Sequence, residues 1–147
     1  MKEVATFFED YLVNAPDGSL LCVPSQSPEN NFAEGSDRYP VTLCVNASMD
    51  MELIHDLLTH LVQACDILGI DADRQRQWRD MLTRLPEPGV GSKGQLLEWN
   101  QEFTELEPGH RHLSHLFGLF PGEQFCPFRR PDLFNAALKS LELRMNS

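Results

Sequence analysis

Apolar side chains recur three and four positions apart in four stretches of the chain. This spacing places them on one face of a helix, so each stretch is expected to bury that face against its neighbours. Gly69 follows the longest stretch as a typical C-terminal stop, and Asp71 or Asp73 is expected to cap the next helix. The predicted helices span residues 3–13, 50–68, about 71–85 and 132–145.

The sequence between these helices is polar and irregular. Residues 19–40 are rich in Pro, Ser, Asn and Gly, and a loop this long in a compact domain is usually functional or disordered. Residues 41–45 fit a short strand or an extended lead-in, 95–103 fit a short helix or a strand, and 112–119 are expected to form a helix. The pattern predicts a mainly α fold of helical hairpins, with a site built from long loops at one end.

The charge and length of the chain exclude some classes of function. The chain has 147 residues, the size of one ordinary domain, and its 12 Lys and Arg against 22 Asp and Glu give a net charge of −10. Such an acidic chain without a basic stripe repels phosphate backbones, so we expect no nucleic-acid partner. It contains no run of about 18 apolar residues and no signal-peptide core, so we expect no membrane span and no signal peptide.

The four cysteines are far apart and form no C-x-x-C pair. This spacing argues against a zinc ribbon or a thioredoxin-like site. We expect buried free thiols.

Three histidines, at 110, 112 and 115, lie within six residues. A helix would place His112 and His115 on one face, whereas an extended segment would pair His110 with His112. The H-x-H-x-x-H spacing is therefore a weak metal signal, lacking the glutamate and the i, i+4 pair of H-E-x-x-H. Three interpretations stay open at this point: a zinc site, substrate-binding or acid–base histidines, and structural hydrogen bonding. We expect no metal.

A carboxylate in the first long loop is a candidate general acid. Glu29 lies in the stretch PSQSPENNF, where Ser27, Asn30 and Asn31 offer hydrogen bonds that could fix a carboxyl group. A carboxyl group partly removed from water in such a loop can donate a proton to a leaving group. The alternative is an ordinary acidic residue of a surface loop.

A second acidic stretch leads into the histidines. Glu98, Glu102, Glu105 and Glu107 could form a carboxylate cluster, and Trp99 could be a platform for the apolar face of a sugar ring. The alternative is a solvated acidic face with a tryptophan in the core.

Taken together and in this order, these blocks resemble the catalytic domain of glycoside hydrolase family 95, the inverting α-L-fucosidases. That resemblance implies an (α/α)6 toroid, of which residues 1–147 would be a single segment, and no cofactor. The matching stretches are FFEDYL at 7–12, PSQSPEN at 24–30, the pair Glu98-Trp99, and HRHLSHLFGLFPG at 110–122.

The resemblance also implies roles for individual residues. Glu29 matches the general acid, and Arg111 and His112 match positions that contact the substrate. Trp99 and Asn30 are expected at the substrate pocket, with His115 orienting its neighbours. The implied reaction is hydrolysis, with inversion, of a terminal α-linked L-fucose from a fucosylated oligosaccharide or glycoconjugate, by a parent enzyme that is secreted or periplasmic.

One part of the family pattern is missing. The asparagines that activate water and the aspartate that polarises them are expected before residue 1 and after residue 147, so we expect the chain alone to be inactive and its unpartnered apolar helix faces to promote self-association. Two other functions stay open beside a fucosidase. An α-L-galactosidase would act on a sugar that differs only by a hydroxyl at C6, and a helical carbohydrate-binding module would have kept the fold without the chemistry.

Overall fold

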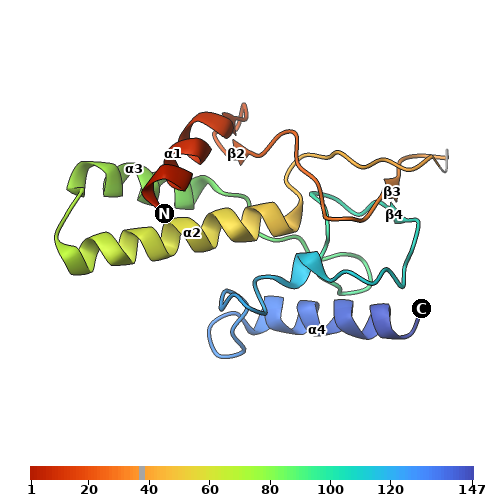
Figure 1. Cartoon of the computed structure of the whole chain (residues 1–147). Helices are drawn as coiled ribbons and strands as arrows, with labels where there is room; N and C mark the ends of the chain where they lie inside the picture. The colour runs from red at the N-terminus through yellow and green to blue at the C-terminus, as the bar shows by residue number, and fades with distance from the viewer. Residues whose placement is uncertain (37–38) are drawn as a thin grey trace.

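A computed structural model describes residues 1–36 and 39–147 of the chain. Helix is its main form of regular structure, which confirms the mainly α prediction (Figure 1). Each of the four predicted helices is present, with ends close to those expected from the apolar spacing. The helices within the described residues are α1 (Lys2–Tyr11), α2 (Ser48–Leu68), α3 (Ala72–Arg84) and α4 (Pro131–Met145).

Short strands and a 3-10 turn organise the loops. β1 pairs antiparallel with β2. β3 pairs antiparallel with β4, although 70 residues lie between the end of β3 at Ala33 and the start of β4 at Thr104. These elements are β1 (Val13–Asn14), β2 (Leu20–Leu21), β3 (Phe32–Ala33), β4 (Thr104–Glu105) and the 3-10 helix η1 (Ser114–Leu116).

The predictions for the loop segments were less accurate. The helix expected over 112–119 was wrong, because only η1 forms there and the backbone around Gly118 bonds to other segments, including the Glu52 carboxylate and the Phe125 N–H. Residues 95–103 form neither a helix nor a strand, apart from one isolated bridge to Val90. Residues 41–45 are an extended lead-in with isolated bridges.

The predictions for the residues at the ends of α2 and α3 are confirmed only in part. Gly69 ends α2 with a φ of 65°, the left-handed conformation that favours glycine. Asp71 precedes α3, but its carboxylate binds Lys2 at 2.6 Å and does not cap the helix.

At the start of α2, the Ser25 hydroxyl accepts from the Ala47 N–H at 2.8 Å and donates to Asp50 at 2.6 Å. The loop that contains Ser25 is therefore fixed to the N-terminus of α2.

Two apolar clusters form the interior. The first joins α1, α2 and α3, and the second lies between α4 and the loops above it in Figure 1. The side chains of the first cluster are Ala5, Leu12, Leu20, Cys22, Met51, Ile54, Leu58, Leu61, Val62, Cys65, Trp78 and Met81. Those of the second are Leu96, Leu116, Phe125, Leu133, Ala136 and Ala137.

Hydrogen bonds join the two clusters through the first turns of α2. The Ser48 hydroxyl donates to the Leu97 carbonyl at 2.5 Å, and the Ser48 N–H donates to the Glu98 carbonyl at 3.1 Å. One turn further, the Glu52 carboxylate accepts from the Gly118 N–H at 2.7 Å. These contacts hold the histidine-containing segment and the Glu98 segment against the same end of α2.

The cysteines are free, as expected, but burial is complete only for Cys22 and Cys65, with Cys44 and Cys126 half-buried. Among the helices of residues 1–36 and 39–147, none is both long and apolar enough to cross a membrane.

Candidate active site

The loop around Glu29 and the histidine segment meet directly. Arg111 Nη2 donates to Glu29 Oε2 at 2.8 Å, and the Glu29 N–H donates to His112 Nδ1 at 3.2 Å. The Ser114 hydroxyl donates to the Pro28 carbonyl at 2.5 Å. The structure thus brings Glu29, Arg111 and His112 together although more than 80 residues separate them in sequence.

Glu29 is not desolvated in this chain, contrary to the expectation for its loop. The Glu29 and Arg111 side chains are each 69% exposed, so the carboxylate is held by a cation at the surface and is open to a ligand. An exposed ion pair of this kind contributes only about 0–1 kcal/mol, because water screens it. Separating Arg111 from Glu29 therefore costs little free energy.

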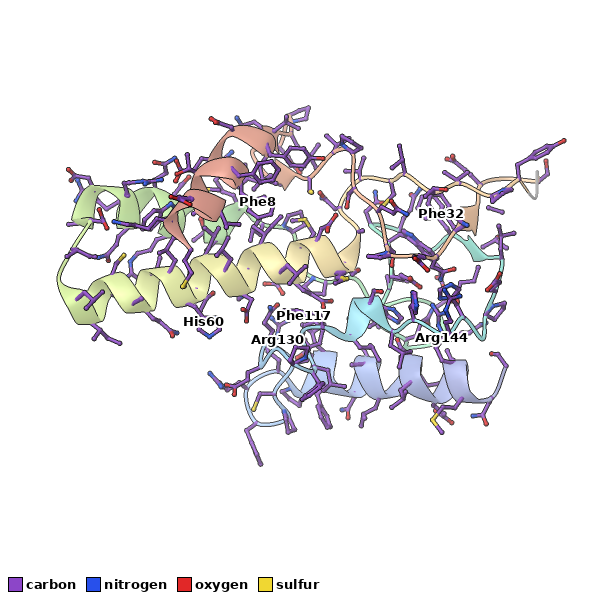
Figure 2. All side chains as sticks on the ribbon, viewed as in Figure 1. Phe8, Phe32, His60, Phe117, Arg130 and Arg144 are labelled. Atoms are coloured by element: carbon purple, nitrogen blue, oxygen red, sulfur yellow. The ribbon has the colours of Figure 1, made fainter. Side chains whose placement is uncertain are left out.

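Of the three polar side chains expected to fix Glu29, Ser27 and Asn30 bind a different carboxylate, and Asn31 Oδ1 accepts from the Thr42 hydroxyl. Ser27 Oγ donates to Glu98 Oε1 at 2.6 Å, and Asn30 Nδ2 donates to Glu98 Oε2 at 3.0 Å. Arg144 also contacts Glu98 Oε2, and the two side chains are only 7% and 4% exposed. Figure 2 shows Arg144 near the C-terminal end of α4, among the loops that pack on this helix. Glu98 is thus the centre of a buried network directly beneath the Glu29 loop.

The three histidines have different environments. His112 faces the Glu29 backbone, while the buried His110 accepts the His112 N–H on its Nδ1 at 3.2 Å. His115 is 2% exposed and its Nδ1 lies 3.7 Å from Glu98 Oε2 without a hydrogen-bond partner. Burial lowers the pKa of His115 to about 4 although the Glu98 carboxylate opposes this shift, so the ring is neutral at pH 7.

This arrangement does not resemble a metal centre. In the part of the chain that the structure describes, no three His, Cys, Asp or Glu side chains converge as metal ligands. His115 packs beside Glu98, which is compatible with the predicted orienting role and gives no direct access to a ligand.

Trp99 lies in an aromatic core and not on an open surface. It is 3% exposed and its ring centroid lies 5.2 Å from that of Phe32 and 6.4 Å from that of Phe103. A sugar platform needs one free ring face, so the core interpretation of Trp99 fits this chain better. Trp99 therefore acts indirectly: it packs on Phe32 of β3, the strand that follows the Glu29 loop.

The four glutamates of the second acidic stretch do not form one cluster. Glu102 accepts hydrogen bonds from Ser92 and Gln95, which lower its pKa, and so shapes a local turn. Glu105 lies 3.5 Å from Arg144, and its half-buried position raises its pKa. Glu107 is exposed. Only Glu98 and Glu105 share a cation.

The buried position of Arg144 was not predicted, although the sequence contains a signal for it. Arg144 follows Ala137 and Ser140 at the spacing of the buried face of α4, so it continues an apolar stripe. A charged residue on a buried face requires a buried partner of opposite charge. The sequence alone does not identify that partner, which is Glu98.

Comparison with known proteins agrees with this geometry. The model of the glycosyl hydrolase family 95 catalytic domain matches residues 1–147. The chain belongs to this family. The family 95 chain is 33% identical over 145 residues to alpha-L-fucosidase 2 of Arabidopsis thaliana, which covers 98% of the chain and 17% of the relative. It is 31% identical over 127 residues to probable alpha-fucosidase A of Aspergillus niger, with 83% and 15% covered.

A third relative, probable alpha-fucosidase A of Aspergillus oryzae, is 32% identical over 111 residues, with 71% of this chain and 14% of the relative covered. The family 95 chain therefore spans only about a sixth of the length of these curated relatives. The resemblance inferred from the Glu29 and histidine motifs is confirmed.

Proposed function

We propose that the chain is one segment of a longer (α/α)6 catalytic domain and that it supplies the acid side of an α-L-fucosidase site. The observation that supports this proposal is the meeting of two distant loops at Glu29, where the exposed carboxylate pairs with Arg111 and the backbone N–H donates to His112. The family match and the names of the relatives support the reaction class and the sugar.

In the proposed reaction, Glu29 donates a proton to the glycosidic oxygen as its bond to the sugar breaks. An inverting glycosidase attacks the opposite face of the sugar with a water that a second group activates. The resemblance assigns that second group to asparagines and an aspartate that lie outside residues 1–147. We therefore expect the chain alone not to hydrolyse fucosides.

Arg111 and His112 are suited to hold sugar hydroxyls. Because His112 Nδ1 accepts the Glu29 N–H, the proton of the neutral ring lies on Nε2, which is then a donor. Arg111 offers several N–H donors once a glycan displaces it from Glu29. Both groups would bind next to the proposed proton donor.

The test uses the longer protein that carries this segment, with an α-L-fucosyl disaccharide and the matching α-L-galactosyl disaccharide as substrates. We expect turnover of the fucoside with inversion at the anomeric carbon, and Glu29→Gln to lower it by about 10²–10⁴-fold. Glu34→Gln, an exposed change in the same loop, is the control and should leave turnover intact.

Preferred turnover of the galactoside would replace fucose by L-galactose in this proposal. If the longer protein binds fucose without hydrolysing either sugar, a carbohydrate-binding module is the better description. An active Glu29→Gln variant would refute the role of Glu29 as the acid.

A further inference from the structure

The turn that carries Glu29 is fixed from below at two points. Ser27 and Asn30 flank Glu29 and donate to the two different oxygens of the Glu98 carboxylate, at 2.6 and 3.0 Å. The Asn30 N–H also donates to the Ser27 carbonyl at 2.9 Å, which closes the turn. Ser27 is 0% and Asn30 2% exposed, so the base of the turn is buried while the Glu29 side chain at its tip is open.

The same network holds the other wall of the site. Arg144, which pairs with Glu98, also donates from Nη1 to the His110 carbonyl at 3.3 Å. His110 in turn accepts the backbone N–H of His112. One buried ion pair therefore connects the Glu29 turn with the segment that carries Arg111 and His112.

We propose that the Glu98–Arg144 pair positions Glu29 relative to the segment that contacts the sugar, with Glu98 and Arg144 as positioning residues. This inference rests on the proposed function, because it assumes that Glu29 protonates the leaving group. A general acid must lie about 2.6–3.2 Å from the oxygen that it protonates. A shift of about 1 Å can lower the rate about 10²-fold.

Misplacing an acid has a kinetic signature that general destabilisation lacks. A leaving group of low pKa, such as dinitrophenolate, departs without a proton, whereas a sugar alkoxide must be protonated as it leaves. Loss of a well-placed acid therefore slows disaccharide hydrolysis much more than hydrolysis of a dinitrophenyl fucoside. A smaller folded fraction slows both by the same factor.

The experiment compares Ser27→Ala with Ser140→Ala in the longer protein. Ser140 is a matched control: it is 4% exposed, and its hydroxyl donates to the Leu96 carbonyl at 3.1 Å and not to Glu98. For Ser27→Ala we expect kcat on an α-L-fucosyl disaccharide to fall about tenfold or more, with kcat on the dinitrophenyl fucoside changed less than about threefold. Ser140→Ala should change kcat by the same factor on both substrates.

Equal losses on the two substrates for a folded Ser27→Ala variant, or no loss on either, would overturn the positioning role. If Ser27→Ala does not fold, Ser27→Cys is the second variant, because its thiol is a weaker donor at the same position. It should also lower kcat more on the disaccharide than on the dinitrophenyl fucoside, by a smaller factor. An inactive wild-type protein, or a Glu29→Gln variant that hydrolyses the disaccharide normally, would instead refute the proposed function and the inference with it.

Discussion

A buried carboxyl group on α2 makes the stability of this protein depend on pH. Glu52 is 2% exposed; its Oε2 accepts the Gly118 N–H at 2.7 Å, and its Oε1 has no hydrogen-bond partner. Burial raises the pKa of Glu52 from 4.5 to about 8, with the Gly118 hydrogen bond opposing the shift. The folded protein therefore keeps Glu52 protonated at pH values where the unfolded chain has released this proton.

The sign of the effect follows from the raised pKa. The contribution of Glu52 to stability is complete below about pH 4.5 and is lost as pH rises to about 8, by up to about 1.4 kcal/mol per pH unit and about 5 kcal/mol in all. Glu52→Gln stays neutral and keeps an oxygen for Gly118. Relative to wild type, the variant should gain about 3 kcal/mol between about pH 5 and pH 7.5.

The assay is urea unfolding followed by fluorescence of the buried Trp78 and Trp99, at several pH values and low protein concentration. His115 acts in the opposite direction, because its pKa is lowered: its contribution is lost as pH falls from about 6.5 to about 4. Comparing variant and wild type at each pH removes this contribution. Glu3→Gln on the exposed side of α1 is the control. A difference between Glu52→Gln and wild type that stays constant with pH would refute the reasoning.

Other predictions concern the buried pair and the surface. Glu98→Gln should lower the free energy of unfolding by about 3–5 kcal/mol, because the buried Arg144 loses its nearest carboxylate and keeps only the more distant Glu105. Adding Arg144→Met should recover part of this loss. The coupling is contradicted if the free energy of unfolding lost by the double variant, measured with urea, equals the sum of the losses of the two single variants. Phe120 and Phe128 are 83% and 93% exposed, so replacing both by Ser should weaken self-association in sedimentation experiments. A wild-type chain that is monomeric at high concentration would contradict the expected association.

Local patterns predicted the helices well because each helix buries one face within a single stretch of sequence. The stripe that ends at Gly69 and the stripe of α4 needed only the spacing of apolar residues. The segment 112–119 has the same apolar content, yet its backbone bonds to Glu52 and to Phe125, and these distant partners replace helical hydrogen bonds. Such tertiary contacts leave no periodic signal.

The site was predictable only in part. The family motifs assigned Glu29, Arg111 and His112 to one site, and the structure shows these residues in contact. The role of Glu98 was not predictable, because Ser27, Asn30 and Arg144 reach it from separations of 71, 68 and 46 residues. The hydrogen-bonding groups beside Glu29 in sequence therefore appeared to serve Glu29 itself.

The central claim is that Glu29 protonates the leaving group of an α-L-fucoside. Its most direct test measures kcat of Glu29→Gln in the longer protein on a dinitrophenyl fucoside and on an α-L-fucosyl disaccharide. We predict near-normal turnover of the first substrate and loss of about 10²-fold or more on the second, because only the sugar alkoxide needs the proton. If Glu29→Gln lowers kcat by the same factor on both substrates, or lowers it on neither, the claim is contradicted.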